Sequence, residues 1–119
     1  MALRHVFVDM DGVLVDFVTA ALDLHGRSDV LADWPLGERD IPKMLGLSAG
    51  EFWSPIHSAG DRYWADLAPY DWTFKLVDLV REFAPFTILT SPSLDPGCPA
   101  GKVQWMNRHL TSGRRKRFR

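Results

Sequence analysis

The stretch His5-Val-Phe-Val-Asp-Met-Asp-Gly-Val-Leu-Val-Asp-Phe17 decides how the rest of this chain is interpreted. Residues 6–8 form a β-prone run that is too short for a helix, and Asp9, Asp11 and Gly12 follow it. In a continuing strand the two carboxylates would lie on one face, where they repel each other unless a cation lies between them or one of them holds a proton. Carboxylate oxygens are ligands that Mg²⁺ prefers. The stretch therefore predicts a strand that ends at a cation site, although Asp and Gly also form plain turns.

The composition of the 119-residue chain suits a single domain. Its hydrophobic content of 46% and charged content of 24% are usual for globular proteins. No apolar run approaches the roughly 20 residues of a membrane span, and Asp9 and Asp11 interrupt the N-terminal apolar run, which argues against a signal peptide. The single cysteine, Cys98, excludes an intrachain disulfide and fits a reducing compartment. We therefore expect a cytoplasmic protein without a membrane partner.

The basic residues are unevenly distributed. Five of the 14 lie in residues 114–119, so the rest of the chain is acidic. An acidic body argues against binding nucleic acid over a broad surface. We interpret residues 111–119 as a basic tail that is a solvated end. A nucleic-acid-binding arm is the weaker alternative, and it would require steeply salt-dependent binding.

Hydrophobic spacing and breaker residues predict strands that alternate with helices. Such an order indicates a parallel α/β sheet with right-handed crossovers, here in one domain over residues 1–119. Residues 27–70 are irregular and rich in aromatic residues, and we expect them to form a small helical cap inserted after the first strand. The other expected elements are a helix from Asp16 to about Leu24, a helix that begins with the capping box Ser48-Ala-Gly-Glu51, a helix at 72–83 capped by Asp71, a strand at 86–89, and a helix with Pro99 in its first turn and Val103, Met106 and Leu110 on its apolar side.

Polar residues also follow the second expected strand. Thr90 and Ser91 come directly after it, as Asp9 comes after the first, and in a parallel sheet both groups would lie at the edge where ligands bind. A hydroxyl and the backbone N–H groups of a tight loop can hold a phosphate oxygen. Lys102, near the start of the last helix, is suited to pair with a phosphate. Each residue alone is ordinary, so the interpretation depends on their occurrence together.

The string Asp9-Met-Asp-Gly-Val-Leu-Val-Asp-Phe17 resembles the first motif of the haloacid dehalogenase-like hydrolases, and looks like their 5′(3′)-deoxyribonucleotidase branch. Leu89-Thr-Ser-Pro92 and Cys98-Pro-Ala-Gly-Lys102 are similar to the second and third motifs of that family. Tyr63-Trp-Ala-Asp-Leu-Ala-Pro69 resembles the return from its cap to its core. The resemblance covers about residues 4–110. It implies a Rossmann-like, haloacid dehalogenase-type parallel core and a Mg²⁺-dependent phosphatase acting on nucleoside monophosphates, most of all deoxyribonucleotides.

The resemblance also implies roles for individual residues. Asp9 would attack the phosphorus of a phosphomonoester, and Asp11 would protonate the leaving alkoxide and then activate water. The Asp9 carboxylate and the backbone carbonyl of Asp11 would hold Mg²⁺. Thr90, Ser91 and Lys102 would bind the phosphoryl group of the substrate.

Three aromatic residues are candidates for holding the nucleobase. Phe17 belongs to the string that resembles the first motif, and Trp53 and Trp64 belong to the expected cap. Because every base offers a flat π-face, these rings could form a slot for it. The alternative is that Trp53 and Trp64 simply fill the core between cap and sheet.

The family carries a fourth, acidic motif after a further strand, and here no Asp or Glu follows Asp95. We therefore expect a chain truncated before that motif, with weak Mg²⁺ binding. One alternative to an active phosphatase is a catalytically impaired relative that binds a nucleotide or a partner. A parallel sheet of two strands also leaves open edges, which would allow pairing with a second copy as a homodimer.

Overall fold

A computed structural model of the protein describes residues 4–90 and 95–111. It shows a mixed α/β chain in which helices predominate and the described strands form one small parallel sheet. The described elements are β1 (Val6–Asp9), α1 (Phe17–Leu24), the 3₁₀ helix η1 (Ser28–Asp33), α2 (Ile41–Leu45), α3 (Ala49–Ala59), α4 (Asp61–Ala65), α5 (Thr73–Phe83), β2 (Phe86–Leu89), α6 (Gly97–Met106) and the π-helix η2 (Asn107–Thr111).

The described residues divide into two compact units. The first unit comprises residues 4–17 and 68–90, which include β1, α5 and β2. The second comprises residues 18–67 and 95–111, which include nearly all of α1 and the helices α2, α3, α4 and α6. The helical stretch that we predict as a cap insert therefore shares its unit with helices from both sides of it in the sequence.

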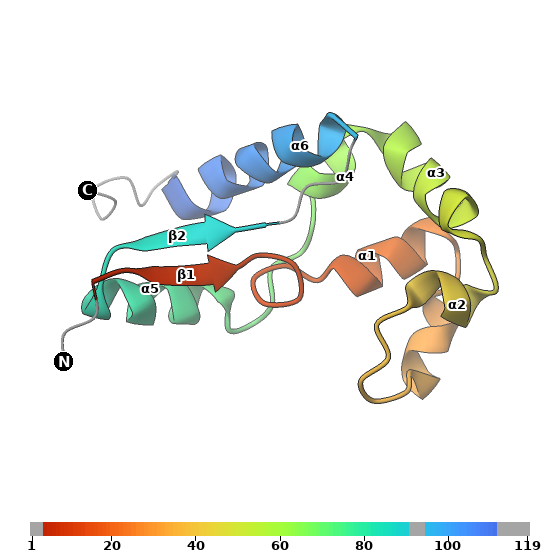
Figure 1. Ribbon diagram of the computed structural model, residues 1–119, viewed down its shortest axis with the longest axis horizontal. Helices are drawn as coiled ribbons and strands as arrows, with labels where there is room; N and C mark the ends of the chain where they lie inside the picture. The colour runs from red at the N-terminus through yellow and green to blue at the C-terminus, as the bar shows by residue number, and fades with distance from the viewer. Residues whose placement is uncertain (1–3, 91–94, 112–119) are drawn as a thin grey trace. The chain divides into compact units, whose positions relative to one another are not determined.

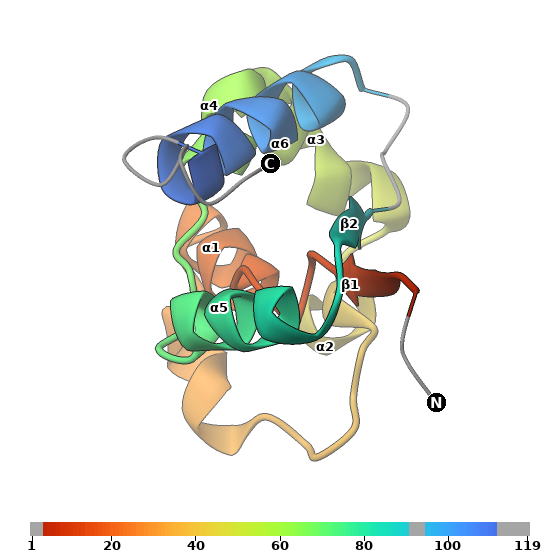
Figure 2. The same ribbon diagram turned by 90° about the vertical axis from the view of Figure 1, so that its left-hand side faces the viewer.

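The sheet of the first unit is parallel, as the alternation of strands and helices predicts. β1 and β2 pair with Val6 opposite Phe86 and Asp9 opposite Leu89. Helix α5, which connects back to β2, runs alongside the two strands (Figures 1 and 2). Val8 of β1 and Val77 of α5 are buried. The two strands are therefore joined by the long crossover that parallel pairing requires.

Local signals set two helix ends where the sequence predicts them. Helix α1 begins directly after Asp16 and ends at Leu24. At the start of α3 the Ser48 hydroxyl accepts the Glu51 N–H (3.1 Å), and the Glu51 carboxylate accepts the Ser48 N–H (3.0 Å). These hydrogen bonds from the backbone and side chain of Ser48 lower the pKa of the Glu51 carboxyl. The predicted capping box is thus confirmed.

The predicted cap of α5 is wrong by one residue. The helix begins at Thr73, so Trp72 rather than Asp71 occupies its N-cap position, and no side chain caps it. The cause is the buried Thr73 hydroxyl, which donates to the Leu14 carbonyl (2.6 Å) and accepts the Tyr70 N–H (3.0 Å). Hydrogen bonds to another segment therefore decide where this helix starts.

The predicted apolar side of the last helix is confirmed only in part. Leu110 is buried, but Val103 is 51% exposed. Within α6 the buried residues are Cys98, Gly101, Lys102 and Trp105. Pro99 does lie in the first turn of the helix, as predicted. The burial of a lysine and a glycine instead of a valine shows that spacing of apolar residues does not decide the orientation of α6.

Two glycines allow α6 to lie directly against α4 in the second unit. A Cβ atom at Gly101 would strike the backbone oxygen of Asp61 and would lie 2.5 Å from Trp64 Cβ. A Cβ atom at Gly97 would lie 2.8 Å from the carbonyl carbon of Gly60. Any side chain at either position would push the helices apart, so the missing Cβ atoms orient α6.

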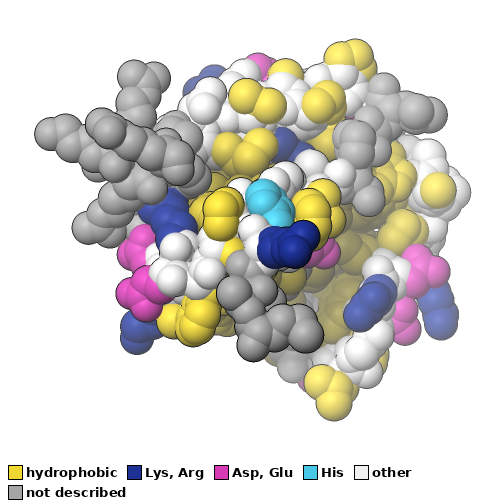
Figure 3. All heavy atoms as spheres, turned by 60° about the vertical axis from the view of Figure 1, so that its left-hand side comes forward, with side chains coloured by type: hydrophobic (Ala, Val, Ile, Leu, Met, Phe, Trp, Pro, Cys, Tyr) yellow, Lys and Arg dark blue, Asp and Glu magenta, His cyan; other side chains and the backbone are white. Residues whose placement is uncertain are grey.

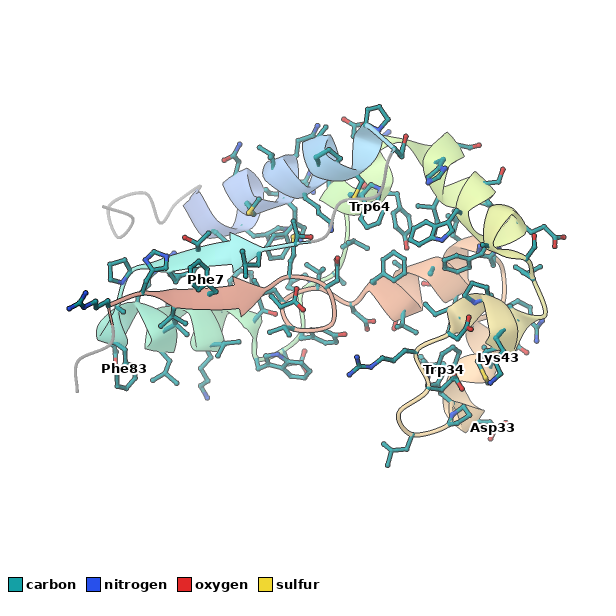
Figure 4. All side chains as sticks on the ribbon, in the orientation of Figure 1. Phe7, Asp33, Trp34, Lys43, Trp64 and Phe83 are labelled. Carbon is teal, nitrogen blue, oxygen red and sulfur yellow. The ribbon has the colours of Figure 1, made fainter. Side chains whose placement is uncertain are left out.

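Several large hydrophobic side chains are exposed, and on the face that Figure 3 shows hydrophobic side chains lie beside basic side chains and a histidine. Phe7 of β1 is 62% exposed and Phe83 of α5 is 64% exposed; both are labelled in Figure 4. Within the described part of the chain, every helix is too short or too polar to cross a membrane.

Candidate functional site

A tight loop follows β1 and is held by backbone hydrogen bonds. The Met10 N–H donates to the Leu89 carbonyl (3.1 Å), which continues the strand pairing by one residue. The Met10 carbonyl then accepts the N–H groups of residues 13, 14 and 15 at 3.3, 2.8 and 3.1 Å. Gly12 adopts a φ of +79°, a conformation that glycine reaches without strain. The chain therefore turns back immediately after the carboxylates.

Three predicted site residues lie at the carboxyl edge of this sheet. Asp9 ends β1 opposite Leu89, and Thr90 directly follows Leu89, so both emerge at the same edge as Asp11. Asp9 is exposed, and its Oδ1 atom accepts the N–H of Met10 (2.9 Å), which orients the carboxylate. Asp11 and Thr90 are partly exposed. This edge presents two carboxylates and a hydroxyl, which are suited to a nucleophile, a proton donor and a phosphate ligand.

A second segment of the first unit braces the loop. The Asp16 N–H donates to the Ala68 carbonyl (2.9 Å), and the Tyr70 N–H donates to the Leu14 carbonyl (3.3 Å). Thr73 is fully buried and adds its hydroxyl bond to the same Leu14 oxygen. Residues 68–73 thus hold the loop through two backbone hydrogen bonds and one buried hydroxyl bond.

Two aromatic residues beside the loop were not among the predicted site residues. The indole N–H of Trp72 donates to the Val13 carbonyl (2.9 Å). The rings of Tyr70 and Trp72 stack with their centroids 4.3 Å apart and their planes 9° apart. Burial and the negative charges of Asp16 and Asp11 raise the pKa of the Tyr70 phenol. The available signal was the pair of aromatic residues two positions apart, directly after Pro69.

Three other predicted site residues come together in the second unit. Lys102 is 1% exposed, and its Nζ atom lies 5.1 Å from the ring centroid of Trp64. Trp53 stacks on Trp64 with centroids 6.5 Å apart, and His57 stacks on Trp53. Trp64, labelled in Figure 4, is itself only 3% exposed. A buried ammonium over an aromatic face is a cation–π contact, which stabilises the charge of the lysine away from water.

The remaining predicted residues lie elsewhere. Phe17 is the first residue of α1 and is partly exposed. Ser91 lies outside the described residues. Across residues 4–90 and 95–111, no three His, Cys, Asp or Glu side chains gather where they could hold a metal ion. A cation at the strand edge would have Asp9 and Asp11 as its protein ligands, with water in other positions, which is a donor type that suits Mg²⁺.

No protein-family model matches the sequence, and no curated protein matches it significantly.

Proposed function

We propose that the chain is a Mg²⁺-dependent phosphomonoester hydrolase with a haloacid dehalogenase-type core, acting on ribo- or deoxyribonucleoside monophosphates. The observation that supports this most is the common position of Asp9, Asp11 and Thr90 at the carboxyl edge of a parallel strand pair. Ligands of open α/β sheets bind at this edge. The resemblance of these residues and of Lys102 to the family motifs supplies the choice of reaction.

The proposed reaction has two steps. The Asp9 carboxylate attacks the phosphorus in line, the bond to the ester oxygen breaks, and Asp11 donates a proton to the leaving alkoxide. This leaves an aspartyl-phosphate on Asp9. Asp11 then takes a proton from a water molecule, the water oxygen attacks the phosphorus, and inorganic phosphate leaves as the Asp9 carboxylate is regenerated. The exposure of Asp9 leaves room for such an attack.

Other groups would stabilise the phosphoryl group. The Thr90 hydroxyl would donate a hydrogen bond to a phosphoryl oxygen. The resemblance to the third motif assigns Lys102 the role of offsetting the phosphoryl charge; this lysine belongs to the second unit, where it is buried over the Trp64 ring. Mg²⁺, held by the Asp9 carboxylate and the Asp11 carbonyl, would neutralise charge between the nucleophile and the phosphate. Two protein ligands make a weak site, so we expect activity to saturate only well above micromolar Mg²⁺.

Phosphate release from a panel of nucleoside monophosphates, with Mg²⁺ present, tests the proposal. Asp9→Asn removes the nucleophile, and we expect kcat to fall by about 10³-fold or more. Asp33→Asn is the matched control, because Asp33 is an exposed carboxylate in η1 of the other unit (labelled in Figure 4). Activity that survives in Asp9→Asn contradicts the mechanism. Nucleotide binding without phosphate release would instead favour a binding protein that lacks turnover.

A further inference from the structure

We infer that the exposed face of Trp72 is the surface on which the planar base of the substrate stacks, with Tyr70 as its support. This inference rests on the proposed function and names the residue that would select nucleotides over other phosphate esters. It is carried by the contacts of the two rings within the first unit and by their position beside Asp11.

The indole ring of Trp72 is held in one orientation from two sides. Its N–H donates to the Val13 carbonyl at 2.9 Å, and the Tyr70 ring covers one of its faces at a centroid distance of 4.3 Å. Trp72 is nevertheless 51% exposed. A tryptophan whose polar atom is already bonded gains nothing further from water by staying at the surface. Its free face is therefore a rigid apolar plate, and binding there orders no side chain.

The plate lies next to the proposed reaction centre. Val13, which holds the indole, is two residues from Asp11, so their Cα atoms are at most about 7 Å apart. The Tyr70 N–H donates to the Leu14 carbonyl at 3.3 Å, so the backbone of the supporting residue also lies against the loop that carries Asp11. One nucleoside monophosphate can span this separation, with its phosphate at the strand edge and its base on the indole.

Hydrogen bonds between residues 70–73 and the loop after β1 make the exposed face of Trp72 a fixed part of the site. Thr73 is buried and binds both the Tyr70 N–H and the Leu14 carbonyl, so the aromatic pair and the loop form one hydrogen-bonded assembly. By contrast, Trp64 has 3% of its surface exposed and Lys102 over its ring. Trp72 consequently offers more free aromatic surface for a base than Trp64 does.

The test compares two substrates that differ only by the base: a deoxynucleoside 5′-monophosphate and deoxyribose 5-phosphate. Stacking on an aromatic side chain contributes about 1–3 kcal/mol per base, or roughly 10- to 100-fold. We expect Trp72→Leu to lower the ratio of kcat/KM for the nucleotide to that for the sugar phosphate by this factor. Trp72→Phe loses the same hydrogen bond to Val13 but keeps an aromatic face, and it should retain most of the ratio. Phe83→Leu removes an exposed ring at the far end of α5 and should leave the ratio unchanged.

Binding measurements separate this inference from the proposed function. Calorimetry with Asp9→Asn measures the affinities for the same two compounds without turnover. If the wild type releases no phosphate, yet binds the nucleotide and loses that binding in Trp72→Leu, the proposed phosphatase function is wrong and the stacking surface stands. If phosphatase activity persists and Trp72→Leu leaves the ratio of the two kcat/KM values unchanged, the stacking inference is overturned and the proposed function stands. Equal loss for both compounds, or no preference for the nucleotide in the unsubstituted protein, also overturns it.

Discussion

The loop after β1 and the contact between α4 and α6 are held together in different ways. In the first unit, backbone groups carry the structure: one carbonyl of Met10 accepts three N–H groups, and residues 14 and 16 pair with the segment at 68–70. In the second unit, the contact depends on the absence of side-chain atoms at Gly97 and Gly101. Backbone hydrogen bonds such as those of the first unit are compatible with many different side chains. The contact between α4 and α6 leaves almost no room for a side chain at Gly97 or Gly101.

This difference bears on how each group of predicted site residues is positioned. Asp9, Asp11 and Thr90 are placed by strand pairing, which is specified by short stretches next to them in the sequence. Lys102 is placed by the packing of α6 on α4, through a glycine that precedes it by one residue. Substitutions in the two units should therefore differ in the size of their effects on stability.

The largest effect is expected from Gly101→Ala. The new Cβ atom would strike the Asp61 carbonyl oxygen and lie 2.5 Å from Trp64 Cβ, so the helices must separate. We expect a loss of about 3 kcal/mol in the free energy of unfolding, measured by urea denaturation followed by circular dichroism. Gly50→Ala in α3 is the matched control, because nothing lies within 4 Å of its Cβ position, and it should cost nothing. Equal stability of the two variants would show that α6 does not depend on this contact.

A smaller effect is expected in the first unit from Thr73→Val. The variant keeps the shape of the side chain but leaves the Tyr70 N–H without its hydroxyl acceptor and Leu14 without its hydroxyl donor. The expected cost is about 2 kcal/mol. Hydrogen exchange of the Tyr70 amide should accelerate accordingly, which locates the effect at the brace.

Thr73→Ser serves as the control for this variant, because it keeps the hydroxyl and loses only a methyl group, worth about 0.8 kcal/mol. Protection of the Tyr70 amide should remain close to that of the wild type in this variant. If both variants accelerate exchange alike, packing rather than the hydroxyl holds the loop.

The smallest effect concerns pH and the second unit. Burial and the charge of Arg108 lower the pKa of His109 below its ordinary value of 6.5. The unfolded chain then binds the proton more tightly than the folded one, so stability is present above about pH 6.5 and is lost as the pH falls through the folded-state pKa. Melting temperatures measured from pH 8 to pH 5 should fall more for the wild type than for His109→Gln. Parallel curves for the two proteins would mean that His109 does not contribute to this dependence.

Local sequence was sufficient for the strands, the capping box of α3 and the placement of Asp9, Asp11 and Thr90. Each of these depends on residues close together in the chain: β-prone runs, turn formers and a serine three residues before a glutamate. Strands separated by helices also predict parallel pairing, because a short hairpin cannot join them. The proposed chemistry at the strand edge follows from these features and from the resemblance of the motifs.

Only the tertiary structure decided the orientation of α6, the start of α5 and the position of the stacked aromatic pair. The spacing of Val103, Met106 and Leu110 indicates an apolar side, and Leu110 is indeed buried. Val103 is exposed, however, and the approach of α4 to Gly101 turns Lys102 and Trp105 inward. Trp72 is anchored by Val13, a residue 59 positions earlier in the chain. Contacts of this kind join segments that no local pattern relates, and their geometry depends on which atoms meet, so the sequence alone does not reveal them.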